Sequence, residues 1–182
     1  MKVIPTDIPE VVVFEPEVHG DHRGYFMETW RFDTFMGAGV ELSFVQDNQS
    51  SSHQGVLRGL HYQIKQPQGK LVRVISGSVF DVAVDLRRSS PTFGRWVGVE
   101  LSADNHRLIW VPPGFGHGFY VLSEQAEFVY KCTDYYAREH ERVISYDDPD
   151  IGIKWPLVSG VETVLSDKDL AGVSLAQADL YD

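Results

Sequence analysis

The sequence predicts an all-β protein, a sandwich or a barrel, from two features of its apolar runs. The runs are short, alternate apolar with polar residues, and are rich in Val, Phe and Tyr, as half-buried strands are. Gly, Pro, Ser and Asn separate them at short intervals, which is typical of strands joined by turns. At 182 residues, one domain can bury roughly two-thirds of its unfolded surface, so we expect a single domain over residues 1–182.

The expected strands follow one another closely along the chain. The period-two pattern predicts them at residues 11–18, 43–50, 56–63, 70–76, 78–86, 96–101, 107–111, 118–122 and 127–133. Ser76 and Gly77 stand between two of these segments, at a place where a hairpin turn is needed. These two segments are therefore predicted to form a β-hairpin.

Helical signals are few and short. Residues 27–36 have the composition for about two or three turns, which Gly37 and Gly39 would end. Near the C-terminus, Ser166 and Asp169 have the Ser-x-x-acid spacing of a capping box at the start of a helix. The sequence therefore predicts short peripheral helices beside the strands.

Side-chain parity assigns faces to two of the strands. In residues 78–86, one face is predicted to be core and the other to be polar or to line a cavity. The first face holds Phe80, Val82, Val84 and Leu86, and the second holds Val79, Asp81, Ala83 and Asp85. In residues 126–134, Tyr130 shares its face with Ala126, Phe128 and Cys132, so its side chain is predicted to point inward. An inward tyrosine hydroxyl needs a hydrogen-bond partner.

Polar and charged residues are unusually dense within the expected strands. Each one alone is explained more simply by a solvent-facing position, because these residue types are usually exposed. Together they favour a polar cavity inside the barrel, since buried charges must be paired. The residues are Gln46, Asp47, Asn48, Arg58, His61, Lys70, Arg73, Asp81 and Asp85.

Three of the polar side chains are candidates for proton-transfer chemistry. His61 is a candidate general base because imidazole titrates near neutral pH. Tyr130 is a candidate proton donor, and Lys70 a candidate electrophile for a developing oxyanion. The alternatives are a structural histidine, a hydrogen-bonded core tyrosine and a lysine beside a hairpin.

Composition excludes several classes of protein. The formal net charge of −10 argues against nucleic acid or an anionic membrane as a partner. The first residues lack an apolar segment of signal-peptide length, and no run of about 18 apolar residues occurs, so a cytoplasmic location is expected. Cys132 is the only cysteine, which excludes an intrachain disulfide. The glycine-rich motifs of Rossmann and P-loop nucleotide sites are absent.

Residues 112–117, Pro-Pro-Gly-Phe-Gly-His, resemble the second motif of the cupin barrels, in which the histidine projects into the barrel. Cupins usually bind a metal through a first motif that contains His-x-His. The corresponding stretch here begins at His61 and has Gln63 in place of the second histidine. These two motifs therefore do not supply a three-histidine metal site, and a metal is disfavoured.

Taken together, the segments resemble the dTDP-4-dehydrorhamnose 3,5-epimerase family. The matching stretches are residues 20–29, 44–50, 56–63, 68–74, 79–94, 111–119, 126–136, 151–157 and 165–169. The resemblance implies a cupin-like double-stranded β-helix, or jelly roll, that forms a homodimer and requires neither metal nor redox cofactor. It implies epimerisation of dTDP-4-keto-6-deoxyglucose at C3 and C5, in dTDP-L-rhamnose biosynthesis.

The resemblance also implies roles for four residues in this reaction. His61 would be the base, Tyr130 the proton donor from the opposite face, and Lys70 the cation beside the enolate oxygen. Asp169 would orient the imidazole of His61, as the aspartate of a catalytic triad does. Because one carboxylate is not expected to serve fully both in this pair and in the capping box, we expect the pair with His61 to prevail.

Further residues are implied to bind the substrate, with Tyr136 stacking on the thymine. They are Arg23, Glu28, Gln46, Asn48, Arg58, His117, Tyr136, Glu141 and Lys168. A guanidinium suits the diphosphate because its planar fork donates two hydrogen bonds. Arg58 and His61 have opposite parity in a regular strand, so a β-bulge at Gly59 is expected to bring them to one site.

Other readings remain open at this point. Enzymes that epimerise only C3 or only C5 stay an alternative, because a sequence does not count proton transfers, whereas related ketoisomerases are expected to lack the segment with the partner acid Asp169. A metal-dependent cupin oxygenase is disfavoured by Gln63. A non-catalytic sugar-nucleotide binding module would leave the conjunction of His61, Tyr130 and Asp169 without a purpose.

Overall fold

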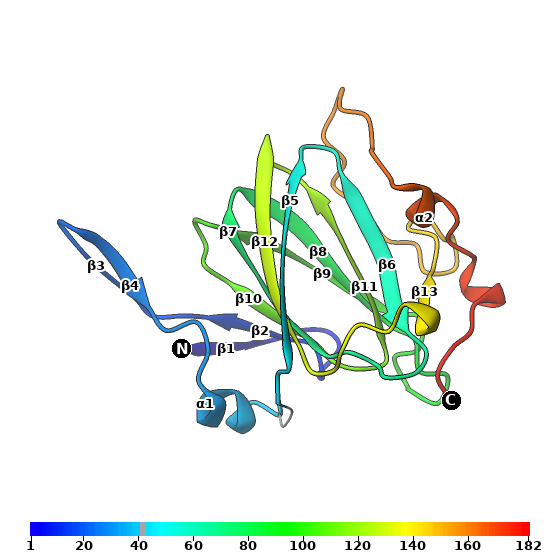
Figure 1. Cartoon of the computed structure of the whole chain (residues 1–182), viewed down its shortest axis with the longest axis horizontal. Helices are drawn as coiled ribbons and strands as arrows, with labels where there is room; N and C mark the ends of the chain where they lie inside the picture. Colours follow the sequence, from blue (N-terminus) through cyan, green and yellow to red (C-terminus); the bar gives the residue numbers. More distant parts are fainter. Residues whose placement is uncertain (41–42) are drawn as a thin grey trace.

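A computed structural model describes residues 1–40 and 43–182 of the chain and confirms the predicted cupin-like jelly roll (Figure 1). Two antiparallel sheets face one another. The six-stranded sheet runs in the order β1 (Lys2–Pro5), β2 (Val12–Glu15), β10 (Leu108–Val111), β7 (Lys70–Ser76), β12 (Gln125–Cys132) and β5 (Gln46–His53). The five-stranded sheet runs in the order β13 (Glu141–Val143), β6 (Leu57–Gln63), β11 (Phe115–Val121), β8 (Ser78–Asp85) and β9 (Trp96–Ser102).

The main core fills the space between the two sheets. Val72 and Phe128 from the six-stranded sheet meet Ala83 and Phe119 from the five-stranded sheet, and Phe119 stacks on Phe128 at 4.2 Å between ring centroids. These positions alternate with outward-facing ones along each strand, as the period-two pattern predicts. The alternation therefore places the apolar half of each strand in one shared interior.

Both faces of β8 are buried, which corrects the expectation that one of its faces is polar or lines a cavity. Val79 and Ala83 pack into the main core, whereas Val82 and Val84 pack into a second apolar cluster on the outer side of the sheet. The chain beyond β13 forms this cluster with them, through residues that include Ile144, Ile151, Leu175 and Ala178. A strand covered on both sides loses the polar alternation by which its solvent face would be recognised.

The predicted hairpin at Ser76–Gly77 is wrong. β7 and β8 do follow one another there, but β7 pairs with β10 and β12, and β8 pairs with β11 and β9 in the other sheet. Gly77 has φ of +73°, and a Cβ on it would lie 2.0 Å from the backbone oxygen of Gln125. The turn therefore carries the chain between sheets, and only glycine fits its conformation and its surroundings.

Helices are short and peripheral, as predicted. α1 is Phe32–Gly37, so it begins later than the expected segment 27–36, and it covers part of the outer face of the six-stranded sheet through Phe35. α2 is Asp167–Leu170, with Ser166 at its N-cap as the capping-box spacing predicts. Two 3₁₀ turns, η1 (Arg138–His140) and η2 (Leu175–Gln177), complete the set. None of the helices in the described residues is long and apolar enough to cross a membrane.

One hairpin projects away from the sandwich. It consists of β3 (Val18–Asp21) and β4 (Gly24–Met27), which pair only with each other, and Figure 1 shows it extending well beyond the two sheets. The segment expected as one strand at 11–18 is thus split into β2 in the sheet and the start of this hairpin. Tyr25 and Phe26 near its tip are 61% and 72% exposed, which is unusual for aromatic residues. The hairpin therefore presents apolar surface that this chain does not cover.

Candidate active site

A pocket of about 330 Å³ lies between the two sheets and is lined mainly by polar side chains. The six-stranded sheet contributes residues of β5, β7 and β12, and the five-stranded sheet contributes residues of β6, β11 and β13. The polar lining residues are Gln46, Asn48, Ser50, Arg58, His61, Gln68, Lys70, His117, Tyr130, Tyr136, Glu141 and Lys168. The predicted polar cavity is therefore present.

Four of the residues expected in this cavity lie outside it. Asp47 and Arg73 occupy the outer face of the six-stranded sheet, because they have the opposite parity to Asn48 and to the inward residues of β7. Asp85 is fully buried at the end of β8, where it accepts hydrogen bonds from Arg87, Ser90 and Thr92. Asp81 lies one layer behind the pocket wall, bound to His117.

His61 in the pocket wall makes a short hydrogen bond to the buried Asp169. His61 donates its Nε2–H to Oδ1 of Asp169 at 2.6 Å, and Asp169 is only 3% exposed. The same Oδ1 accepts the backbone N–H of Gly59 at 3.1 Å, and Oδ2 accepts the hydroxyl of Ser166 at 2.6 Å. With Nε2 engaged, Nδ1 of His61 carries the free lone pair. No group in the described residues hydrogen-bonds this nitrogen.

Asp169 pairs with His61, as expected, rather than completing the capping box, because among the described residues its side chain makes no hydrogen bond to the backbone N–H of Ser166. Asp169 divides its two oxygens, with Oδ1 on His61 and Oδ2 on the N-cap residue Ser166. Its own backbone N–H bonds the Ser166 hydroxyl oxygen at 3.2 Å. A carboxylate has about four lone-pair positions, which is enough for both contacts.

Burial and hydrogen bonding set the charge states of this pair. Burial acts to raise the pKa of Asp169, but the hydrogen bonds from His61, Ser166 and Gly59 outweigh it and hold that pKa well below its usual range. Desolvation lowers the pKa of His61 below its ordinary value, although the hydrogen bond to Asp169 acts in the opposite direction. At neutral pH the pair is therefore a neutral imidazole beside an ionised carboxylate.

Gly59 allows Arg58 and His61 to face the same pocket. The register of β6 with β11 pairs His61 with His117 and Arg58 with Phe119, so three steps on β6 oppose two on β11. This is the predicted β-bulge. Gly59 has φ of +130°, and a Cβ on it would lie 2.5 Å from the Cα of Gly118. Only glycine fits both this conformation and this close approach.

Tyr130 points inward, as parity predicted, and packs against the main core. Its hydroxyl has no hydrogen-bond partner among the described residues, which argues against the purely structural reading of this side chain. Desolvation raises the pKa of Tyr130 to about 12. The phenol therefore carries its proton throughout the physiological pH range.

Lys70 and His117 add positive and hydrogen-bonding character to the same wall. Burial lowers the pKa of Lys70, and the nearby charges of Asp81 and Glu141 oppose that shift. His117 donates its Nε2–H to both oxygens of Asp81, at 3.1 and 3.0 Å. His117 therefore forms a second His–Asp pair with a carboxylate behind the pocket wall, and it lies directly across from His61 in the strand register.

The rim of the pocket is a hydrogen-bonded network of candidate binding residues. Gln46 donates to the side chain of Asn48 at 3.1 Å and accepts the backbone N–H of Tyr136 at 2.9 Å. Glu141 accepts the hydroxyl of Tyr136 at 3.0 Å and the amino group of Lys168 at 2.9 Å. The Tyr136 side chain lines the pocket and is half exposed, so part of its ring is accessible to a ligand.

Arg58 is held in place by a residue that the sequence analysis did not single out. The guanidinium of Arg58 donates from Nε and Nη2 to the hydroxyl of Ser52 on β5, at 3.2 and 2.9 Å. Ser52 and Ser166 are both serines that hold a charged side chain of the site. A serine in a β-strand has many ordinary roles, so the sequence carries no specific signal for the Ser52 contact. The Ser-x-x-acid spacing does link Ser166 to Asp169, but it does not specify the contact of the hydroxyl with the carboxylate.

Gln63 has a structural role. Its amide nitrogen donates to the backbone oxygens of Gln66 and Tyr135, and its oxygen accepts the backbone N–H of Ala137. All three contacts are to backbone, so they fix the chain that carries Tyr136 at the pocket rim. The described residues contain no group of three or more His, Cys, Asp or Glu arranged to hold a metal ion.

Two of the expected binding residues lie far from this pocket. Arg23 is at the turn of the projecting hairpin, where its guanidinium pairs with Asp21 and is largely exposed. Glu28 follows the hairpin and lies 3.8 Å from Arg31. Neither lines the pocket between the sheets. Within one copy of the chain, the structure does not bring them to the site.

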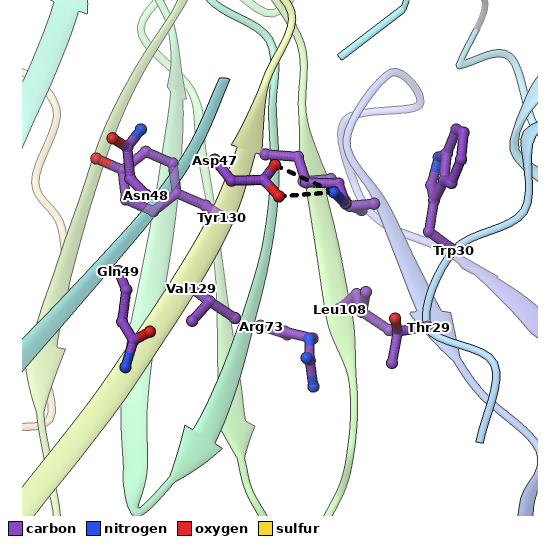
Figure 2. Close-up of a pocket in the computed structure, with 11 residues that line it drawn as sticks. Thr29, Trp30, Asp47, Asn48, Gln49, Arg73, Leu108, Val129 and Tyr130 are labelled. Carbon is purple, nitrogen blue, oxygen red and sulfur yellow. Dashed lines mark hydrogen bonds and ion pairs between the residues drawn. The ribbon is translucent and has the colours of Figure 1, made fainter. Parts of the chain in front are cut away.

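A second hollow, a groove of about 490 Å³, lies on the outer face of the six-stranded sheet (Figure 2). Thr29 and Trp30, which follow the projecting hairpin, form one side of it. Lys131 on β12 forms an ion pair of 3.0 Å with Asp47, its register partner on the neighbouring strand β5. Arg73 has no hydrogen-bond or ion-pair partner in the part of the chain that the structure describes. This groove is larger than the pocket but lacks its His–Asp pairs.

Comparison with known sequences identifies one protein family over nearly the whole chain. The family model described as dTDP-4-dehydrorhamnose 3,5-epimerase matches residues 5–177. A curated relative of that name from Pseudomonas aeruginosa is 58% identical over 182 residues, which is 100% of this chain and 99% of the relative.

Solved structures agree with the sequence comparison. The dTDP-6-deoxy-D-glucose-3,5-epimerase of Legionella pneumophila, in complex with dTDP-4-keto-L-rhamnose, is 53% identical with a TM-score of 0.95, over 98% of this chain and 94% of that one. A 3'-monoepimerase from Streptomyces bikiniensis, in complex with dTDP-quinovose, is 38% identical with a TM-score of 0.87, over 94% and 87% of the two chains. With this likeness in sequence and fold, and a polar pocket at its centre, the chain belongs to the dTDP-4-dehydrorhamnose 3,5-epimerase family.

Proposed function

We infer that this protein is an isomerase that converts dTDP-4-dehydro-6-deoxy-D-glucose to dTDP-4-dehydro-L-rhamnose by moving protons at C3 and C5. The observation that carries the mechanism is the hydrogen bond of 2.6 Å between His61 and the buried Asp169, in a pocket that also holds Tyr130 and Lys70. Both carbons adjoin the C4 ketone. Removing a proton from either one yields an enolate, so the chemistry calls for a base, an oxyanion stabiliser and an acid.

His61 is the proposed base, acting through Nδ1. Its Nε2–H is bound to Asp169, which fixes the tautomer and leaves the Nδ1 lone pair available for a substrate proton. When Nδ1 takes that proton, the ionised Asp169 stabilises the imidazolium that forms. Asp169 itself stays ionised, because three hydrogen bonds hold its carboxylate.

Lys70 and Tyr130 are proposed to complete the proton transfers. The ammonium of Lys70 would face the oxygen at C4 and stabilise the negative charge that develops there. Tyr130 comes from the opposite sheet to His61, so it can return a proton to the other face of the planar enolate. Protonation on the face opposite to abstraction inverts the carbon. No redox step is involved, and we propose that the reaction needs no cofactor.

The nucleotide is proposed to bind along the rim of the pocket. Arg58 presents a guanidinium positioned by Ser52 for a phosphate oxygen, and Tyr136 offers the accessible part of its ring for the thymine. The other proposed binding residues on this chain are Gln46, Asn48, His117, Glu141 and Lys168. With a net charge of −10 on the whole chain, local cations of this kind must attract the anionic ligand.

We propose a homodimer in which the projecting hairpin of one copy reaches the pocket of the other. Arg23 and Glu28 lie on or beside that hairpin, away from the pocket of their own chain. The exposed Tyr25 and Phe26 supply apolar surface, and the groove beside Trp30 supplies a complementary hollow. Two equivalent hairpins exchanged about a two-fold axis would cover these surfaces and complete both sites. The single domain over residues 1–182 and the cytoplasmic location stay predictions.

The test of this function is incubation of dTDP-4-dehydro-6-deoxy-D-glucose with the protein in D₂O, followed by mass spectrometry and NMR of the product. We expect two enzyme-dependent deuterons and inversion at both C3 and C5. A His61→Ala control should slow both exchanges by about 10²–10⁴-fold, the usual effect of a positioned acid or base. One deuteron would instead indicate a mono-epimerase, and an unlabelled substrate would contradict the proton-transfer mechanism.

A further inference from the structure

Ser166 makes contacts that its place in the fold does not require. It is an exposed residue at the N-cap of α2, a helix of only four residues. An N-cap serine needs only to accept a backbone N–H, which Ser166 does from Asp169 at 3.2 Å. Its hydroxyl proton is then free, and it is donated to Oδ2 of Asp169 at 2.6 Å.

The contact matters because Asp169 is the partner of the proposed base. The Gly59 N–H binds Oδ1 and the Ser166 hydroxyl binds Oδ2, so each carboxylate oxygen has a hydrogen-bond donor other than His61. These two donors fix the rotation of the carboxylate about its Cβ–Cγ bond, so that Oδ1 points at Nε2 of His61. The direction of that hydrogen bond decides which ring nitrogen of His61 carries the proton.

We propose that Ser166 is a positioning residue for the epimerisation, the third member of a Ser166–Asp169–His61 chain that keeps Nδ1 of His61 free to take the substrate proton. This inference rests on the proposed function. Ser166 touches neither the substrate pocket lining nor His61 directly. It acts through the orientation of Asp169, and its removal therefore changes the rate of proton transfer more than substrate binding.

Helix capping and carboxylate positioning are separable by the choice of substitution. Glycine is nearly as good as serine at an N-cap, whereas alanine is poor, but neither has a hydroxyl to donate. Threonine caps and also donates, and the exposed position of Ser166 leaves room for its methyl group. The three variants Ser166→Gly, Ser166→Ala and Ser166→Thr thus vary the cap and the donor independently.

We expect Ser166→Gly and Ser166→Ala to lower kcat by about tenfold each, the usual effect of one hydrogen bond to a charged group, with KM within about twofold of the wild type. Ser166→Thr is expected to recover most of the lost rate. Ser174→Gly is the matched control, because Ser174 stands at the N-cap of η2 and its hydroxyl donates to Gln177, away from the site. A Ser166→Gly enzyme as fast as the wild type would reduce Ser166 to a helix cap and overturn the proposal.

A second measurement determines which ring nitrogen of His61 carries the proton, and it does not depend on catalysis. In protein labelled with ¹⁵N at histidine, the wild type should show His61 protonated on Nε2, and the glycine and alanine variants should show a larger share of the Nδ1–H form. An unchanged tautomer in both variants would contradict the proposal even if their rates fell. If the wild-type protein exchanges no substrate proton, the proposed function fails, while the tautomer still decides whether Ser166 orients the pair.

Discussion

Burial shifts the pKa of three side chains of the pocket, and for His61 and Tyr130 the direction suits the role proposed. It lowers the pKa of His61 and of Lys70, and it raises the pKa of Tyr130 to about 12. A base must be unprotonated to act, and the lowered value keeps His61 neutral at physiological pH. A donor must keep its proton, and the raised value ensures that Tyr130 does.

These shifts predict the pH profile of kcat/KM. Activity requires neutral His61. Because the pKa of His61 is lowered, the midpoint of the acid limb should lie below pH 6.5, the ordinary pKa of imidazole. Activity also requires cationic Lys70. Because the pKa of Lys70 is lowered, the midpoint of the alkaline limb should lie below pH 10.5, the ordinary pKa of lysine. Tyr130 should not contribute below about pH 12. An acid limb centred above 6.5 would contradict this assignment of the base.

Asp81 is a buried carboxylate whose neutralisation should cost stability. It is fully buried, and both of its oxygens accept the Nε2–H of His117. Asp81→Asn keeps the size of the side chain but removes the charge from these hydrogen bonds, so the free energy of unfolding should fall by about 1–3 kcal/mol. Chemical denaturation measures this change. In a double-mutant cycle with His117→Gln the two losses should not add, and strict additivity would show that the pair contributes nothing.

At the scale of elements, side-chain parity predicts which way single side chains point, but it does not predict which sheet a strand joins or whether its outer face is covered, as the face of β8 is. The prediction from parity that Tyr130 points inward is confirmed, and so is the bulge that the glycine in β6 indicates. The prediction of a hairpin at Ser76–Gly77 is wrong, because a glycine turn between two strands is equally suited to a crossover between sheets. Local composition sets the turn, whereas long-range pairing sets its partners.

The bulge in β6 predicts that Gly59 tolerates no side chain. In Gly59→Ala the new Cβ would meet Gly118 at 2.5 Å and the backbone would be held at φ of +130°, so both the fold and the position of His61 should suffer. We expect a lower melting temperature and a loss of activity. Gly37→Ala is the matched control, since Gly37 lies in α1 with nothing within 4 Å of a new Cβ. This control should be neutral or slightly stabilising, and equal effects of the two substitutions would contradict the role given to the bulge.

At the scale of the whole molecule, one chain brings most of the expected site residues together but leaves Arg23 and Glu28 outside the pocket. The sequence correctly indicated a polar cavity with His61, Lys70 and Tyr130, because all three lie on inward faces of their strands. Arg23 and Glu28 could not be placed from the sequence, since they lie on a hairpin that leaves the sandwich. Single-chain patterns contain no information about which surface of a second copy such a hairpin reaches.

Sites shared between two copies predict complementation. Arg23→Ala and His61→Ala should each be nearly inactive alone, because each removes a group from both sites of the proposed homodimer. If Arg23 acts on the pocket of the other copy, a mixed dimer contains one site with both changes and one site with neither. Co-expression of the two variants should then restore roughly a quarter of the wild-type rate, since half of the dimers are mixed and half of their sites are intact. No recovery, with mixed dimers demonstrated by mass spectrometry, would place Arg23 and His61 in the same site of one copy.

The link between His61 and Asp169 also bears on how the enzyme reaches its working state. The two residues are 108 positions apart in the sequence, and the Gly59 N–H that binds the same carboxylate is 110 positions from it. Closing so long a loop costs conformational entropy that only the surrounding native contacts offset, which slows its formation. The proposed base therefore gains its partner only when segments far apart in the sequence have been brought together by the fold. After dilution from denaturant, recovery of catalytic activity would report the fully folded protein. The fluorescence of tryptophans packed on the sheets would report the packing of the sheets.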